Sequence, residues 1–434
     1  MAVTPAVADA FVIEGSRRLS GTIRAAGNKN GALPILAACI LVDGVVTLAN
    51  VPRIRDVDTM LDLLCDLGAD AAWTGANEVR VDARGASKSA PDERLCSMMR
   101  ASFLLAGPLL SRFGRATMPP PGGDVIGRRR LDPHMHALSE LGAEIDLSGR
   151  LYELQATRLH GSNLFLDEAS VMATENTVMA AVLARGETVL GNAACEPHVQ
   201  DLCRFLVSAG ARIEGIESNV LRISGVERLE GGSWSIGADH IEVGSFIGMA
   251  AITGGDITVE GVRRQDLVSI VPAFAKLGVR LEIGEDTVHV PTKQQLIVED
   301  DLGGMVPKIE DGPWPAFPSD LTSIALTVAT QAFGTVLMFE KMFENRLFFT
   351  DKLVSMGARI ILCDPHRAVV TGPARLVGQR MESPDIRAGM AMLLAALSAE
   401  GQSTIGAAHQ IDKGYERIDE RLRTLGAAIE RIDN

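Results

Sequence analysis

The sequence predicts an α/β fold built from six helix–strand repeats that are divided between two domains. The chain has 434 residues, and a chain of this length usually folds as more than one domain. Apolar residues make up 47% and charged residues 22%, which is typical of a globular protein with sizeable cores. The third observation is a pattern that recurs six times, in which an amphipathic stretch ends at a glycine and a short apolar strand follows.

The repeat is marked by two glycines in each unit. A glycine after the last helical turn supplies the left-handed cap that lets the chain reverse into a strand. The other mark precedes it, in ILVDGVVTL, SRFGRATMP, LARGETVLG, ITGGDITVE, QAFGTVLMF and SAEGQSTIG, where a helix is again expected to end at Gly and an alternating strand to follow. Each repeat should contain a helix, a strand, a loop, a second helix and a second strand, in this order. Six such repeats suit two domains of three repeats each. The capping glycines are Gly68, Gly142, Gly210, Gly278, Gly357 and Gly426, separated by 74, 68, 68, 79 and 69 residues.

Composition excludes several classes of function. The net charge of -13 argues against a nucleic-acid binder, whose surface should be basic. The six cysteines form no CxxC pair, so we expect reduced, mostly buried thiols of a cytosolic protein and neither a zinc site nor a disulfide framework. The N-terminus lacks the features of a signal peptide. The charge-free run from Leu321 to Phe339 is interpreted as a buried helix, a glycine stop and a strand, not as a membrane span.

The loops between the two glycine marks are rich in Arg, Asp and Glu, while the framework around them is apolar. Functional residues gather on such loops. The segment PPPGGDVIGRRRLDPH, residues 119–134, places one acid, Asp124, at a proline- and glycine-rich bend and three arginines behind it. A semi-rigid arm with a flexible bend suits a lid, and guanidinium groups grip phosphate or carboxylate. The alternative for the arginines is a solubilising run.

Two cations stand where an apolar helix is expected to begin. Lys29, followed by Asn30, opposes the helix dipole, and an anionic ligand there would compensate it. Arg100 opens the apolar segment SMMRASFLLAGPL in the same way. An exposed turn is the alternative for Lys29.

Further acids and cations lie on comparable loops. Asp320 follows the proline-rich GPWPAFPS and opens a helix, where a plain N-cap is an alternative explanation. The remaining candidates are Arg346 after Glu344 and Asn345, Asp385 capping a helix with Arg387 in its first turn, and Lys413 beside Asp412.

These segments resemble the enolpyruvyl transferase superfamily, most closely its members that act on UDP-N-acetylglucosamine. The resemblance covers essentially the whole chain and implies a two-domain inverse α/β barrel with three repeats in each domain. Residues 29–237 would form the first domain. Residues 1–28 and 238–434 would form the second, with a cleft between the two. The resemblance rests on GNKNGALPILAA, NVPRIRDVDTM, MRASFLLAGPL, PPGGDVIGRRRLD, DHIEVGSF, PAFPSDL, FENRLFF, PDIRAGMA and IDKGYERID, in this order.

The resemblance implies transfer of the enolpyruvyl group of phosphoenolpyruvate to the 3'-hydroxyl of UDP-N-acetylglucosamine, with release of phosphate, as the first committed step of peptidoglycan synthesis. The enol carbon must be protonated and the sugar hydroxyl deprotonated, which needs two oppositely tuned groups. No metal, organic cofactor, nucleic acid or membrane is implied, and a cytoplasmic location is expected. The alternatives are an enolpyruvyl transferase for another acceptor and a non-catalytic paralogue that binds the UDP-sugar.

Carried over position by position, the resemblance assigns Asp320 as a candidate general base near the sugar 3'-hydroxyl and Asp124 as the proton donor at the loop tip. Lys29 is the third candidate catalytic residue, a cation at the phosphate of phosphoenolpyruvate. The matched substrate-binding positions are Arg129 and Lys413 at that phosphate, Arg346 and Arg387 near the carboxylate, Asn30 at the sugar, Arg100, His134, Ser170 and Val171 near the uridine diphosphate, and Glu196, Asp239, Met342 and Asp385 elsewhere.

Four positions depart from the family pattern. Asp124 stands where many members have Cys, and Lys413 where Arg is commoner. Glu168 replaces a Lys of some members, and Met172 replaces a Gly beside the diphosphate. Fosfomycin inactivates the family by epoxide opening at the loop-tip cysteine, so the chain is expected to resist it.

Overall fold

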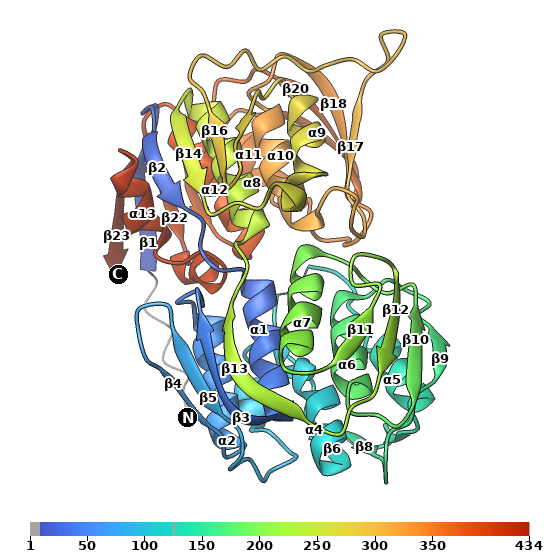
Figure 1. Ribbon diagram of the computed structural model, residues 1–434. Helices are drawn as coiled ribbons and strands as arrows, with labels where there is room; N and C mark the ends of the chain where they lie inside the picture. The colour runs from blue at the N-terminus through green and yellow to red at the C-terminus, as the bar shows by residue number, and fades with distance from the viewer. Residues whose placement is uncertain (1–8, 125, 434) are drawn as a thin grey trace. The chain divides into compact units, whose positions relative to one another are not determined.

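The computed structural model describes residues 9–124 and 126–433, so the segment on which the signal-peptide expectation bears lies largely outside the described residues. The described chain divides into two units by its internal contacts (Figure 1). Unit 1 comprises residues 9–26, 126–128 and 238–433, and unit 2 comprises residues 27–124 and 129–237.

In unit 2 each repeat places a helix, a strand, a second helix and then further strands. The helices are α1 (Lys29–Ala38), α2 (Arg55–Asp66), α3 (Glu93–Cys96), α4 (Ala106–Phe113), α5 (Asp132–Glu140), α6 (Val171–Ala181) and α7 (Pro197–Ser208), with 3-10 helices η1 (Cys39–Leu41) and η2 (Arg100–Leu105). The strands are β3 (Val42–Ala49), β4 (Asp70–Trp73), β5 (Val79–Asp82), β6 (Arg115–Met118), β7 (Glu144–Asp146), β8 (Tyr152–Gln155), β9 (Asn163–Phe165), β10 (Glu187–Gly191), β11 (Arg212–Glu214), β12 (Val220–Ser224) and β13 (Leu229–Ser235).

The described strands of unit 2 form three sheets, with strand orders β13-β3-β5-β4, β6-β8-β7 and β11-β12-β10-β9. In each sheet the strands that follow the second helix turn back antiparallel to one another, as β4 and β5 do. The last strand of the unit, β13, runs parallel to the first, β3, with Leu229 opposite Val42. This pairing joins the two ends of the unit's sequence.

Unit 1 repeats the same order of elements. Its helices are α8 (His240–Thr253), α9 (Ile270–Ala275), α10 (Thr322–Ala329), α11 (Thr350–Ser355), α12 (Ile386–Ser398) and α13 (Ile418–Thr424), with 3-10 helices η3 (Arg264–Leu267), η4 (Ser319–Leu321) and η5 (Ala408–Lys413). Its strands are β1 (Asp9–Glu14), β2 (Ser20–Arg24), β14 (Asp256–Glu260), β15 (Glu282–Ile283), β16 (Thr287–Val290), β17 (Lys308–Glu310), β18 (Gly334–Phe339), β19 (Arg359–Asp364), β20 (Arg367–Gly372), β21 (Arg380–Glu382), β22 (Gln402–Gly406) and β23 (Ala428–Asp433).

The start of the described chain supplies strands to two of the three described sheets of unit 1. Strand β1 lies between β22 and β23, antiparallel to both, with Ala10 opposite Gly406. Strand β2 runs parallel to β14 at the edge of the next sheet. The two ends of the described chain are therefore joined by hydrogen bonds. The strand orders are β21-β22-β1-β23, β15-β16-β14-β2 and β17-β18-β20-β19.

The core of unit 1 is a cluster of the first helices of its repeats. Helices α8, α10 and α12 are buried along nearly their whole length and pack against one another (Figure 1). Helices that are apolar on every side, as these are, must be enclosed. A small residue brings α8 close to α10, because a Cβ on Gly248 would lie 2.9 Å from Ile324 Cγ2.

The structure confirms the predicted order of helices and strands and the role of the capping glycines. All six have positive φ, from +80° at Gly278 to +111° at Gly357. At four of the six earlier glycines the expectation that a helix ends there was wrong. The preceding helices end earlier, at Leu41, Ala181, Ala329 and Ser398, so that Gly44 lies inside β3, Gly334 opens β18, and Gly186 and Gly401 come just before β10 and β22. Gly114 and Gly254 do cap helices, as predicted.

Two further expectations are confirmed, apart from a glycine stop. The Leu321–Phe339 run ends η4, forms the buried helix α10 and then forms β18, which its glycine opens. The cysteines are all free thiols, and four of the six are buried. Among the described residues, no helix is long and apolar enough to cross a membrane.

The capping glycines allow a test of backbone strain. At Gly210, φ is +109° and a Cβ would meet nothing within 4 Å. Gly210→Ala should therefore lose only about 1–2 kcal/mol of unfolding free energy, from the left-handed backbone. At Gly357, φ is +111° and a Cβ would lie 2.6 Å from Arg375 O, so Gly357→Ala should lose at least about 1 kcal/mol more. Urea unfolding measures both, and equal losses would contradict the steric argument.

Candidate active site

A partly buried carboxylate held by two arginines lies in unit 1. Asp320, in η4, accepts two hydrogen bonds from Arg387 through one oxygen, at 3.0 Å from Nε and 2.7 Å from Nη2. Its other oxygen accepts from Nη2 of Arg346. Arg387 lies in the first turn of α12, and Arg346 lies in the turn after β18. Only 7% of the Arg346 side chain and 6% of the Arg387 side chain are exposed.

Electrostatics keep Asp320 ionised in this arrangement. Burial raises the pKa of its carboxyl, but the charges of Arg387 and Arg346 outweigh burial and hold the pKa well below its usual range. The same contacts act on the arginine, because the Asp320 charge outweighs burial and raises the pKa of Arg387. Nε of Arg346 and Nη1 of Arg387 are buried and have no hydrogen-bond partner among the described residues. The cluster thus keeps two donors available for an incoming anion.

Two more acids cap helices beside this cluster. Asp239 is the N-cap of α8 and accepts from Ile241 N at 2.9 Å and Glu242 N at 3.2 Å. Burial raises its pKa to about 6, and the nearby charge of Arg387 opposes that rise. Asp385 caps α12, as predicted, and accepts from Arg387 N at 2.8 Å.

Asp320 itself is not a helix cap. The N-cap of α10 is Leu321, and no side chain makes a cap hydrogen bond there. The plain N-cap explanation for Asp320 is therefore wrong. Both of its oxygens are taken up by arginines instead, and charge-assisted bonds to guanidinium are stronger than a bond to a backbone N–H.

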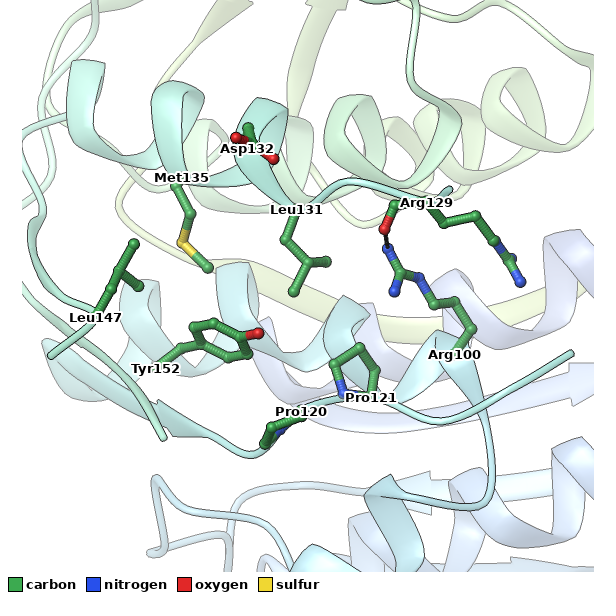
Figure 2. A pocket seen from close by; sticks show the side chains of 9 residues that line it. All are labelled: Arg100, Pro120, Pro121, Arg129, Leu131, Asp132, Met135, Leu147 and Tyr152. Atoms are coloured by element: carbon green, nitrogen blue, oxygen red, sulfur yellow. Dashed lines mark hydrogen bonds between the residues drawn. The ribbon is translucent and has the colours of Figure 1, made fainter. Parts of the chain in front are cut away.

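A pocket of about 480 Å³ lies in unit 2 (Figure 2). Figure 2 shows Arg100 and Arg129 at one end and Leu147 and Met135 at the other. An apolar and aromatic wall with two cations at one end suits a flat, partly apolar ligand that carries an anionic group. The lining residues are Arg100, Pro120, Pro121, Arg129, Leu131, Asp132, Met135, Leu147 and Tyr152.

Arg100 is held by the loop that it faces. Its Nη2 donates to Arg129 O at 2.6 Å and more weakly to Arg130 O. Burial and the charge of Arg129 lower the pKa of Arg100 to about 10. Among the described residues no carboxylate forms an ion pair with Arg100, so its neighbourhood favours an anion.

The loop after β6 has no regular structure over residues 119–124 and 126–131, as expected. Asp124 is partly buried there, and its carbonyl oxygen accepts from Arg129 Nη1 at 3.5 Å. Within unit 1, Ile126 O accepts from Asn345 N, and Arg128 N donates to Glu344 Oε2. The cations of the loop are not equivalent, since Arg130 pairs with Asp167 at 2.9 Å and Glu168 at 3.6 Å.

Lys29 is the first residue of α1, and Asn30 is the second. Nζ of Lys29 lies 2.6 Å from Oδ2 of Asp56, in the first turn of α2. The predicted mismatch between Lys29 and the helix dipole is thus compensated within the chain. Asp56 was missed, although it stands in the quoted segment NVPRIRDVDTM, where its charge gave no sign of its partner.

The other predicted residues have more local roles in the structure. His134 is buried, bonds Asn176 at 3.0 Å and packs against the Phe103 ring, and burial lowers its pKa to about 3. Ser170 caps α6, which Val171 begins, and Glu196 precedes α7. Met342 N donates to Glu340 Oε1, and Lys413, the last residue of η5, donates to Gln410.

Two buried groups beside the arginine cluster were also missed. The Tyr415 ring lies 5.4 Å from the Arg387 guanidinium carbon, and its hydroxyl bonds Ser245 Oγ at 2.8 Å. Glu340 is fully buried behind the turn that carries Arg346. Tyr415 stands in the quoted segment IDKGYERID, and Glu340 directly follows the quoted segment QAFGTVLMF, but only burial shows their importance. Among the described residues, no group of three or more His, Cys, Asp or Glu is arranged to hold a metal ion.

Comparisons with known proteins agree with this architecture. The family model described as EPSP synthase (3-phosphoshikimate 1-carboxyvinyltransferase) matches residues 13–422. A UDP-N-acetylglucosamine 1-carboxyvinyltransferase of Bradyrhizobium diazoefficiens is 56% identical, covering 97% of this chain and 98% of the relative. Proteins of the same name from Borreliella burgdorferi and Treponema pallidum are 52% and 53% identical, over 97% and 96% of this chain and 99% and 98% of theirs.

Solved structures show the same fold at lower identity. The enolpyruvyl transferase NikO from Streptomyces tendae has a TM-score of 0.88 at 23% identity, covering 98% of this chain and 99% of its own. EPSP synthase from Acinetobacter baumannii has a TM-score of 0.75 at 18% identity, covering 98% and 100%. The chain therefore belongs to the EPSP synthase family of enolpyruvyl transferases, alongside the UDP-N-acetylglucosamine 1-carboxyvinyltransferases.

Proposed function

We propose that this chain transfers the enolpyruvyl group of phosphoenolpyruvate to the 3'-hydroxyl of UDP-N-acetylglucosamine and releases phosphate, in peptidoglycan synthesis. The observation that carries the proposal is the identity of 52–56% over nearly the full length with relatives that bear this enzyme's name. The buried arginine cluster and the cationic pocket support a substrate pair with several anionic groups.

We also propose the domain arrangement that goes with this function. Residues 29–237 form one domain, and residues 1–28 with 238–434 form the other, each an inverse α/β barrel of three repeats. Support comes from the three described sheets in each unit and from the enclosed helices of unit 1.

The chemistry requires a proton to be added to the enol carbon while the sugar oxygen bonds to the adjacent carbon. Loss of phosphate and of a proton then restores the enol double bond. We assign Asp320 as the base for the sugar hydroxyl and Asp124 as the donor to the enol carbon. Lys29, Arg129 and Lys413 are assigned to the phosphate of phosphoenolpyruvate.

Asp320 is a weak base while two arginines hold it. We propose that the carboxylate of phosphoenolpyruvate takes over Arg346 and Arg387, whose guanidinium groups fit a carboxylate in a two-pronged fashion. Asp320 would then lose much of the charge compensation that depresses its pKa and become a better proton acceptor. Binding of one substrate would thereby activate the base for the other.

The pocket of unit 2 is proposed to hold the uridine diphosphate. Leu131, Met135 and Tyr152 offer surface to the flat base, and Arg100 and Arg129 offer charge to the diphosphate. Ser170 and Val171 are assigned to the same nucleotide. His134 is assigned a contact through its main chain, because its ring is buried. The remaining assignments, to the sugar and its surroundings, are Asn30, Glu196, Asp239, Met342 and Asp385.

The direct test measures phosphate release from phosphoenolpyruvate with UDP-N-acetylglucosamine and, in parallel, with shikimate 3-phosphate and a free nucleoside. Release only with the UDP-sugar is expected. Release with another acceptor alone, or with none, would reject the proposed function.

Asp320→Asn should lose about 10²–10⁴-fold in kcat, which is the usual value of general base catalysis. The amide keeps the shape but removes the charge that accepts the proton. Affinity for UDP-N-acetylglucosamine, measured by calorimetry, should change little. A kcat within threefold of the natural protein would remove Asp320 from the mechanism.

Arg100 and Arg130 form a matched pair for the nucleotide pocket. Arg100→Ala should raise the KM for UDP-N-acetylglucosamine by about 10–100-fold, since a charge-assisted contact to phosphate is lost. Arg130→Ala should change it less than threefold, because Arg130 already pairs with Asp167 at the surface. Similar changes in both variants would argue against the assigned pocket.

Fosfomycin tests the residue at the loop tip. A carboxylate opens an epoxide far less readily than a thiolate, so the natural protein should stay active and unmodified, as mass spectrometry would show. Asp124→Cys should become sensitive, and Asp124→Asn should lose most turnover because its amide cannot donate the proton. A stoichiometric adduct on the natural protein, or full activity of the Asn variant, would overturn the assignment of Asp124.

A further inference from the structure

Two buried carboxyl groups lie side by side behind the arginine cluster of unit 1. Strands β17 and β18 run parallel, with Glu310 opposite Phe339. Asp311 and Glu340 are the next residues on the two strands, and Asp311 N donates to Phe339 O at 3.2 Å. Asp311 is 1% exposed and Glu340 is 0% exposed. Neither residue was assigned a role by the family resemblance.

Most hydrogen-bond donors around the pair contact Oε1 of Glu340 or Oδ1 of Asp311, and Ser319 Oγ also lies 3.1 Å from Oε2 of Glu340. Oε1 of Glu340 accepts from Ser319 Oγ at 2.9 Å, from Met342 N at 3.2 Å and from Phe343 N at 3.1 Å. Oδ1 of Asp311 accepts from Lys341 N. Oδ2 of Asp311 is buried without a donor among the described residues. Two adjoining carboxyl groups in this position are satisfied if one proton lies between them.

The charges that face Glu340 are those of Asp311, Arg346 and, beyond Arg346, Asp320. Burial and the Asp311 carboxyl raise the pKa of Glu340 to about 9, although Arg346 and Ser319 oppose that rise. The ring of His366, between β19 and β20, bonds the main-chain oxygen of Glu340 at 2.7 Å, and Glu340 N donates to His366 O at 2.8 Å. The Lys341 ammonium lies 3.6 Å from Glu310. These surroundings favour the protonated form of the Glu340 carboxyl.

Two of the residues that donate hydrogen bonds to Glu340, Ser319 and Phe343, lie next to the arginine cluster. Ser319 immediately precedes Asp320. Phe343 lies three residues before Arg346, and its ring centre is 5.4 Å from the Arg346 guanidinium carbon. One carboxyl group thus holds both the 3-10 turn that carries Asp320 and the turn that carries Arg346.

We propose that Glu340 and Asp311 share one proton, and that this protonated pair positions Arg346 against Asp320. Both are positioning residues, since they act through the turns that they hold and touch no assigned substrate group. The kinetic consequence rests on the proposed function, whereas the shared proton and the position of Arg346 do not.

The shared proton has a signature in stability. The pKa of Glu340 is raised in the folded chain, so folding takes up a proton between pH 4.5 and about 9, and the stabilisation is lost progressively as pH rises through that range. Glu340→Gln carries no such proton. Relative to this variant, the folding constant of the natural protein should fall by up to about tenfold per pH unit from pH 5 to 8.5.

Glu344→Gln is the matched control for this measurement. Glu344 lies on the same turn, but its pKa is lowered by backbone hydrogen bonds, so the difference between this variant and the natural protein should be constant above pH 5. Urea unfolding at pH 5, 6, 7, 8 and 8.5 decides between the outcomes. A difference for Glu340→Gln that does not change with pH would overturn the shared proton.

The positioning role is tested by single and double amide variants. In Glu340→Gln the amide nitrogen replaces the proton and donates to Asp311, so kcat should stay within about threefold. Asp311→Asn should be equally mild, because its amide donates to Glu340. The double variant sets two NH₂ groups against each other, and flipping either one leaves a buried backbone N–H without an acceptor.

The double variant should therefore lose at least about tenfold in kcat and raise the KM for phosphoenolpyruvate, because Arg346 moves from its place. Crystal structures of the three variants would show directly whether Arg346 still contacts Asp320, whether or not the variants are active. The contact should persist in both single variants and break in the double variant. If it persists in the double variant, or if the two changes are simply additive, the positioning role is wrong.

If the natural protein releases no phosphate with any acceptor, the proposed function is rejected, but the unfolding and crystallographic results still test whether Glu340 and Asp311 share a proton and position Arg346. If the natural protein is active and the double variant is unaffected, the positioning role of Glu340 and Asp311 is rejected and the proposed function is kept.

Discussion

The arrangement of unit 1 depends on the pairing of one partly buried carboxylate, Asp320, with two buried guanidinium groups. A buried charge costs several kcal/mol unless opposite charges and hydrogen bonds compensate it. The required partners come from distant parts of the sequence, the turn after β18 and the first turn of α12. Asp320 and its arginine partners can meet only if the enclosed helices α8, α10 and α12 pack in a defined arrangement. The close packing of α8 against α10 at Gly248 fixes part of that arrangement.

Other cations of the chain differ in whether an acid side chain compensates their charge. This difference distinguishes cations with a structural role from cations that are suited to bind an anionic ligand. Lys29 is buried but has Asp56 within 2.6 Å, and Arg130 has surface acids. Arg100 is partly buried, donates only to carbonyl oxygens and lies near another arginine. An uncompensated cation of this kind is costly in the free protein, and that cost is removed when an anion binds.

Burial acts in opposite directions on neighbouring carboxyl groups of unit 1. Asp320 stays ionised because two cations contact it, whereas burial, reinforced by the adjoining Asp311 carboxyl, raises the pKa of Glu340 to about 9. The pKa of Asp239 is also raised by burial, but less, because the charge of Arg387 and two backbone N–H groups oppose the rise. The charge state of each acid thus depends on its immediate partners as well as on its burial.

The sequence by itself determined the six repeats, the capping glycines and the helix caps such as Asp385, because these depend on residues within a few positions of one another. It also determined the family, through ordered segments that span the chain. It could not show that Asp56 compensates Lys29, that Asp320 serves two arginines and caps nothing, or that Asp311 adjoins Glu340. Those contacts join residues 26–67 positions apart. Only the tertiary structure decided them, since burial and distance fix the energy of a charge and neither is encoded locally.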